Sequence, residues 1–122
     1  MKVIPIKDDI YNTNIFIIPD ANEADLVSLF KRRYGLNHKY DNDCDGLHLK
    51  IVDQTAGKDY HYLIFDKLGN TPKDIGVFNH EMLHLVFSVF SIIGIKYSDD
   101  SEEAFAYYLS YLTEKILNKV IR

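Results

Sequence analysis

The hydrophobic and polar positions of this chain change their period several times, and each change predicts a new element. Residues 13–18 (TNIFII) form a short apolar run rich in β-branched and aromatic types, closed by Pro19-Asp20, which predicts a buried strand. Residues 47–53 and 60–65 alternate between apolar and polar types, as strands do. The polar stretch 54–59 lies between them, so the two segments predict a hairpin.

Apolar positions at helical spacing predict helices before and after this hairpin. Residues 21–34 have such spacing, and Gly35 follows as a typical helix terminator. Thr71-Pro72 is typical of an N-cap followed by proline in the first turn, and it predicts a helix over 72–93 that stops at Gly94.

A second long helix is expected near the C-terminus. Asp99 with Glu102, and Asp100 with Glu103, each have capping-box spacing, so the helix should begin near Asp99 or Asp100. A helix and a small sheet followed by two long helices indicate an α+β arrangement. At 122 residues the chain is expected to form one domain, residues 1–122.

Composition narrows the classes of partner. The net charge of −4 disfavours binding to nucleic acid. The longest apolar stretch, residues 83–95, is interrupted by polar residues and Gly94, so no membrane span is expected. No secretion signal is visible, and the single cysteine, Cys44, fits a reducing compartment; we therefore expect a cytoplasmic protein.

Residues 80–84 read His-Glu-Met-Leu-His, within the helix predicted over 72–93. Two histidines four positions apart share one helix face, where both imidazoles can reach one zinc ion. Glu81 is rotated by about 100° from His80, so it can face the fourth coordination position and accept a proton from water bound there. The motif predicts zinc ligands at His80 and His84 and a general base at Glu81.

A zinc site of this kind needs a third protein ligand, and Asp99, Asp100, Glu102 and Glu103 are the downstream candidates. The stretch Glu103-Ala104-Phe105-Ala106-Tyr107 resembles the Asn-Glu-Gly-Phe-Ala segment of gluzincins of the aminopeptidase branch. In that branch the third ligand stands nineteen positions after the second histidine, as Glu103 does after His84. The resemblance implies Glu103 as the ligand, whereas helical periodicity places Glu102 nearer the apolar stripe.

Residues 80–111 also resemble the C-terminal part of small metallopeptidases of phages and prophages. This resemblance implies a minimal zincin-like domain with an N-terminal helix, a small antiparallel or mixed sheet, an HExxH helix and a glutamate helix. It implies a bacterial or phage-encoded zinc peptidase, an endopeptidase acting on peptides or proteins. The Gly-x-Met-Glu-Asn segment that holds the substrate amine in aminopeptidases is not found, which argues against that specificity.

Other polar residues carry weaker signals. Tyr107 lies one turn after Glu103 and is a candidate donor to the oxyanion of a tetrahedral intermediate. His48 and His61 lie on the two hairpin strands and could approach each other, most simply as ordinary cross-strand histidines. Asp41, Asp43 and Asp45 alternate like the start of a calcium loop, but its twelfth position would be Val52 instead of glutamate.

Two functions remain open. The first is a zinc-dependent peptidase; the second is a zinc-binding phage structural or host-interaction protein on a zincin scaffold, without proteolytic activity. The small size leaves one wall of a cleft missing, which a second copy in a homodimer could supply. For the peptidase, we expect residues 47–51 to form an edge strand beside the active-site helix, which would bind an extended peptide by main-chain hydrogen bonds.

Overall fold

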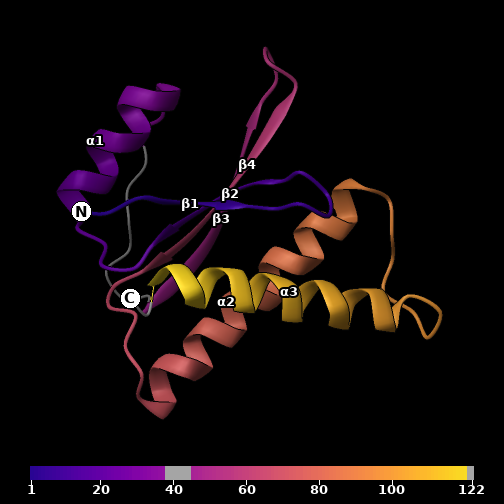
Figure 1. The fold of residues 1–122 in the computed structure, drawn as a ribbon. Helices are drawn as coiled ribbons and strands as arrows, with labels where there is room; N and C mark the ends of the chain where they lie inside the picture. Colours follow the sequence, from indigo (N-terminus) through magenta and orange to yellow (C-terminus); the bar gives the residue numbers. More distant parts are fainter. Residues whose placement is uncertain (38–44, 121–122) are drawn as a thin grey trace.

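The computed structural model describes residues 1–37 and 45–120 of the chain (Figure 1). In these residues it has α+β architecture, with one mixed sheet and three helices, as the sequence predicts at this level. The elements in chain order are β1 (Ile4–Lys7), β2 (Asn14–Ile18), α1 (Glu23–Tyr34), β3 (Gly46–Asp53), β4 (Lys58–Phe65), α2 (Pro72–Ile92) and α3 (Glu102–Val120). The stretch that holds His38, Asp41, Asp43 and Cys44 lies outside the described residues, so the expectations placed on it are not addressed.

The four strands lie in the order β1-β2-β4-β3. The pairs β1–β2 and β3–β4 are antiparallel, and β2 runs parallel to β4. The parallel pair at the centre joins two hairpins, and α1 lies within the connection between its strands. The expected edge position of residues 47–51 is confirmed, because β3 pairs only with β4 among the described residues.

Strand β1 is absent from the sequence-based prediction. The run Val3-Ile4-Pro5-Ile6 is short and contains a proline, which weakens it as a strand because proline has no N–H to donate. In the structure β1 lies at the edge of the sheet opposite to β3, and Pro5 pairs with Phe16 of β2. An edge strand has one unpaired side, so a missing N–H is tolerated there.

The sheet separates two hydrophobic clusters, with α1 on one side and α2 and α3 on the other (Figure 1). Alternation along β4 divides its side chains between them. Leu63 and Phe65 pack with α2 and α3, whereas Tyr62 and Ile64 pack with α1. On β3, Leu47, Leu49 and Ile51 belong to the α1 side. The remaining β3 positions, starting with Gly46 and His48, therefore face α2.

Helix α2 begins as expected. Thr71 is its N-cap, and the reciprocal bonds between Thr71 and Asp74 complete a capping box, with proline in the first turn. The helix ends at Ile92, and Gly94 follows with φ 83°. By length and composition alone α2 could also cross a membrane, a property shared with core helices of soluble proteins. Seven of its side chains are buried.

Helix α3 begins later than the sequence predicts. Its first residue is Glu102, and the amide of Phe105 donates to the carbonyl of Ser101 at 3.1 Å. Ser101 also accepts at its hydroxyl from the amide of Ser98 at 2.9 Å, which closes a turn over Ser98–Ser101. The expected caps at Asp99 and Asp100 are therefore wrong, because this turn holds both residues outside the helix.

A buried carboxylate fixes α3 against the N-terminal hairpin. Asp8 is 4% exposed and accepts hydrogen bonds from the amides of Ile10, Tyr11 and Thr13 at 3.0–3.2 Å. The hydroxyl of Tyr108 donates to the same side chain at 2.7 Å. Burial and this hydrogen bond raise the pKa of Tyr108, so the phenol remains the donor.

Candidate functional site

His80 and His84 lie on the exposed face of α2 with their rings turned toward each other. Their Nε2 atoms are 3.1 Å apart. Two imidazole ligands of a tetrahedral zinc ion, each at about 2.0–2.1 Å, would have their nitrogens about 3.3 Å apart. The pair therefore fits two adjacent positions of one metal ion, as the sequence predicts from its spacing.

Glu81 lies on a different side of α2 from the exposed histidine pair. It is 7% exposed, and its Oε1 atom is 3.8 Å from Nε2 of His80. A Cβ atom built on Gly46 would come within 3.1 Å of Cγ of Glu81, so the glutamate lies against the start of β3. Glu81 is thus held between helix and strand, with its carboxylate close to one of the two imidazoles.

A hollow of about 710 Å³, here called the site hollow, opens between α2 and the edge strand β3. Helix α2 contributes the motif residues and strand β3 contributes the opposite wall. The residues that line it are Asp45, Gly46, Leu47, His48, Lys73, Gly76, Val77, His80, Glu81 and His84. Of the expected strand over residues 47–51, Leu47 and His48 thus lie beside His80 and His84.

The structure does not bring the predicted third ligand to the histidine pair. Glu102 and Glu103 are both exposed. No group of three His, Cys, Asp or Glu side chains that could hold a metal ion is found in residues 1–37 and 45–120. Tyr107 is 69% exposed and, like Glu103, is not in the described lining of the site hollow.

The first turn of α3 nevertheless lies beside the turn of α2 that follows His84. The ring of Phe105 is 5.0 Å from that of Phe87 and 4.1 Å from that of Phe90, measured between centroids. Phe87 is three residues after His84, so the two side chains lie close together on α2. The backbone that carries Glu102 and Glu103 is therefore adjacent to the histidine helix, although the two carboxylates point into solvent.

A second histidine pair joins the two strands of the hairpin. Nε2 of His48 is 3.0 Å from Nδ1 of His61, and the rings are stacked with centroids 5.3 Å apart. Burial lowers the pKa of His48 to about 4, with smaller contributions from His61, His84 and Lys50. Burial also lowers the pKa of His61 to about 4, helped by Lys50. Both imidazoles are therefore neutral at pH 7.

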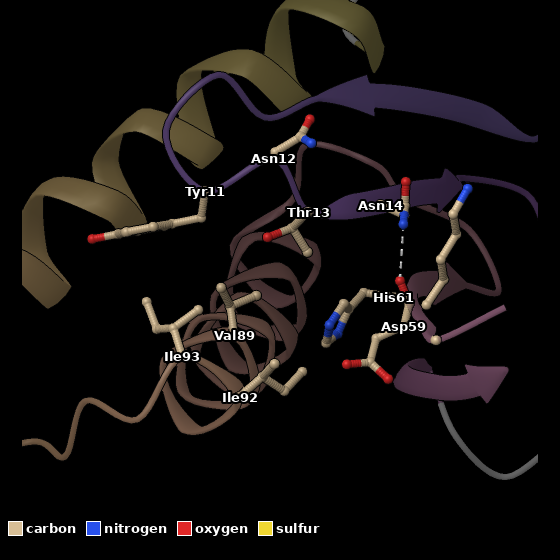
Figure 2. A pocket seen from close by; sticks show the side chains of 11 residues that line it. Tyr11, Asn12, Thr13, Asn14, Asp59, His61, Val89, Ile92 and Ile93 are labelled. Carbon is tan, nitrogen blue, oxygen red and sulfur yellow. Dashed lines mark hydrogen bonds between the residues drawn. The ribbon is translucent and has the colours of Figure 1, made fainter. Parts of the chain in front are cut away.

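Of this pair, His48 lines the site hollow, whereas His61 lines a second hollow of about 350 Å³ that borders the last turn of α2 (Figure 2). Figure 2 shows the ring of His61 directed from β4 toward α2, beside Asp59. His61 is fully buried, and its Nε2 atom has no hydrogen-bond partner within the described residues. Sequence reasoning placed the two histidines on facing strands but gave no reason to connect them with the HExxH motif.

A scan against protein families, a search of curated proteins and a search of solved structures each found no match.

Proposed function

We propose that this protein is a zinc-dependent peptidase of the zincin type, an endopeptidase that hydrolyses peptide or protein substrates. The observation that supports this best is the convergence of the two Nε2 atoms of His80 and His84, 3.1 Å apart, at a hollow that Glu81 also lines. Two metal ligands and one acid–base group on one helix, facing an accessible hollow, are the parts of a metal-assisted hydrolase that this helix can supply; a third protein ligand has to come from elsewhere.

In this proposal His80 and His84 hold the zinc ion, and Glu103 completes the ligand set. When bound, zinc would polarise the scissile carbonyl and make a water molecule more acidic. Glu81 takes a proton from the attacking water and delivers it to the leaving amine nitrogen. Its low exposure supports this role, because packing between α2 and β3 keeps the carboxylate near the reacting atoms.

Glu103 as third ligand requires a side-chain movement from solvent toward His84. Support comes from the contact of Phe105 with Phe87, which brings the first turn of α3 next to the histidine pair. Glu102 is the alternative: at 100° per residue it lies about 60° from Phe105 around the helix, whereas Glu103 lies about 160° away. Both residues are in the first turn of α3 and both are exposed.

The endopeptidase assignment rests on the shape of the site. The site hollow is bordered by β3, whose outer edge is unpaired in the described part of the chain. A strand edge of this kind can bind an extended peptide by main-chain hydrogen bonds that are tolerant of sequence. The sequence lacks the glutamate segment that would select a free amino terminus.

The experiment combines metal analysis with hydrolysis of unfolded casein. The wild-type protein is expected to bind about one zinc ion per chain and to cleave casein internally. His84→Ala should lose most of the zinc, and Glu81→Gln should keep the zinc and the fold while losing hydrolysis, because an amide cannot accept the proton. Asn79→Ala, an exposed neighbour on the same helix, is the matched control and should change neither. Unchanged zinc in His84→Ala contradicts the site.

A second candidate function is zinc binding without proteolysis. It is favoured by one observation: the described residues contain no group of three side chains positioned for a metal ion. A protein of this kind would bind zinc through His80 and His84 but show no hydrolysis of casein. Zinc content equal to one per chain, together with cleavage that disappears in Glu81→Gln, excludes it.

A further inference from the structure

On the side of β3 that faces α2, the imidazole ring of His48 lines the site hollow. Gly46 packs closely against α2, because a Cβ built on it would come within 2.8 Å of Cγ1 of Val77 and 3.1 Å of Cγ of Glu81. His48 is the next residue on the same face and lines the hollow opposite the helix. A peptide carbonyl placed between strand and helix would therefore have His80, Glu81 and His84 on one side and His48 on the other.

The orientation of His48 is fixed by its partner. Its Nε2 atom is 3.0 Å from Nδ1 of His61, which is fully buried and belongs to the central strand β4. Nδ1 of His48 has no hydrogen-bond partner within the described residues, and the residue lines the site hollow. One nitrogen of His48 is thus anchored, and the other is the atom with which the ring can contact a ligand.

The hydrogen bond between His48 and His61 and the burial of Nε2 of His61 indicate which ring nitrogens carry the protons. If Nε2–H of His48 donated to His61, the proton of His61 would be on Nε2, where a buried N–H would have no acceptor. Orphaned buried N–H groups are rarer than unsatisfied acceptors. The favoured arrangement therefore has Nδ1–H of His61 donating to Nε2 of His48. His48 then carries its own proton on Nδ1, as a hydrogen-bond donor.

We propose that Nδ1–H of His48 donates a hydrogen bond to the carbonyl oxygen of the bound peptide and to the oxyanion that forms from it, with His61 as the positioning residue. This inference rests on the proposed peptidase function. In this proposal His48 is the oxyanion donor, in place of Tyr107, the candidate from the sequence. A fixed, neutral donor needs no reorganisation as charge develops on the oxygen, which is how such groups lower the barrier.

The tautomers can be tested without zinc or substrate. Long-range proton–nitrogen NMR spectra of the metal-free protein should show His48 protonated on Nδ1 and His61 protonated on Nδ1, with Nε2 of His61 bare. A proton on Nε2 of His48 overturns the proposal whatever the protein hydrolyses, because its Nδ1 would then be unable to donate.

Three variants test the contact with substrate. His48→Phe should keep zinc content and lower kcat on casein-derived peptides by roughly a hundredfold, with KM little changed, since one oxyanion donor contributes about 10²–10³ in kcat. His48→Asn places an amide N–H near the position of Nδ1 and should recover part of kcat. Val52→Thr, an exposed position on the same face of β3, lies outside residues 47–51 and outside the described lining of the site hollow; it is the matched control and should leave kcat unchanged.

The positioning role of His61 predicts a distinct result. His61→Phe removes the donor to His48 while filling the buried volume, so kcat should fall by less than in His48→Phe. Two outcomes overturn the proposal while leaving the peptidase function intact: unchanged kcat in His48→Phe, or zinc loss in that variant as large as in His84→Ala, which would make His48 a ligand. A wild-type protein that binds zinc but cleaves nothing removes both proposals together.

Discussion

Glu102 and Glu103 differ by one position and compete for one role. The resemblance to gluzincins favours Glu103, whereas the observed helix turns Glu102 closer to the packed face of α3 that contains Phe105. We predict that Glu103→Gln weakens zinc binding by tenfold or more, since an amide is a poor substitute for a charged ligand. Glu102→Gln is the matched variant and should change affinity little. The reverse order, measured by competition with a zinc indicator, would transfer the ligand role to Glu102.

Asp8 and Tyr108 form a polar contact that the sequence pattern could not reveal. Their side chains are 100 positions apart in the chain, and the carboxylate is buried. Tyr108→Phe is predicted to lower the free energy of unfolding by about 1–3 kcal/mol, because a buried charged acceptor loses a donor. Tyr111→Phe, one turn later with its hydroxyl at the surface, should cost less than about 1 kcal/mol. Urea unfolding of the two variants measures the difference; equal effects would contradict it.

His61 makes stability depend on pH with a defined sign. Its pKa is about 4 in the folded protein and about 6.5 in an unfolded chain, so the unfolded state binds more protons between these values. The free energy of unfolding should therefore fall as pH decreases from 6.5 toward 4, by up to about 1.4 kcal/mol per pH unit for this residue. Urea unfolding with a chelator at pH 7, 6 and 5 measures the slope. His61→Phe should reduce it, and an unchanged slope would contradict the assignment.

At the scale of elements, the contact of β3 with α2 depends on a glycine. A Cβ on Gly46 would meet Cγ1 of Val77 at 2.8 Å and Cγ of Glu81 at 3.1 Å. Gly46→Ala should therefore destabilise the protein by about 1–3 kcal/mol and displace Glu81, with a loss of hydrolysis. Gly76→Ala is the control, because its Cβ would meet nothing within 4 Å and alanine favours a helix by about 0.5–1 kcal/mol. Thermal unfolding should show shifts of opposite sign.

The elements that the sequence predicts well are those with local signals. Helices α1 and α2 have a capping residue at the start and a glycine after the end, and their observed bounds are close to expectation. Strand β1 was missed because Pro5 is acceptable only at a sheet edge, and edge position is a property of the whole sheet. The start of α3 was misplaced because several residues near it can serve as caps, and the turn at Ser98–Ser101 selects one.

In the candidate site too, the residues on one helix can be predicted from the sequence, whereas those that meet through contacts between elements cannot. His80, Glu81 and His84 lie on one helix, so a fixed spacing is sufficient to place them together, as observed. His48 joins them through the packing of β3 on α2, and its orientation depends on β4. Contacts between separate elements are decided by sheet order and helix packing, which periodicity alone does not specify. The position of Glu103 relative to His84 depends on α3 in the same way and stays a prediction.

At the scale of the whole molecule, the sheet gives the site hollow one of its walls, which in the proposed function binds the substrate. Strand β3 is the edge strand nearest the histidine pair, and Lys50 on it is exposed, as charges on edge strands often are. A peptide that pairs antiparallel with β3 would hydrogen-bond to it through alternate residues only. Its path along the strand would lead past Gly46 and His48 and therefore past the histidines of α2.

This alternation predicts a periodic response to N-methylation of a peptide substrate. Methylation of one amide that faces β3 removes a hydrogen bond and adds bulk at the strand edge, so KM should rise by roughly tenfold, equivalent to about 1.4 kcal/mol. Methylation of the adjacent amides, which face solvent, should leave KM nearly unchanged. The kcat value should show the same two-residue period only for amides close to the cleaved bond. Kinetics on a series of singly methylated peptides of one sequence measure this directly. A uniform response along the peptide would show that the substrate does not bind as an added strand, and the site would then have to select its substrates through side-chain contacts in the hollow.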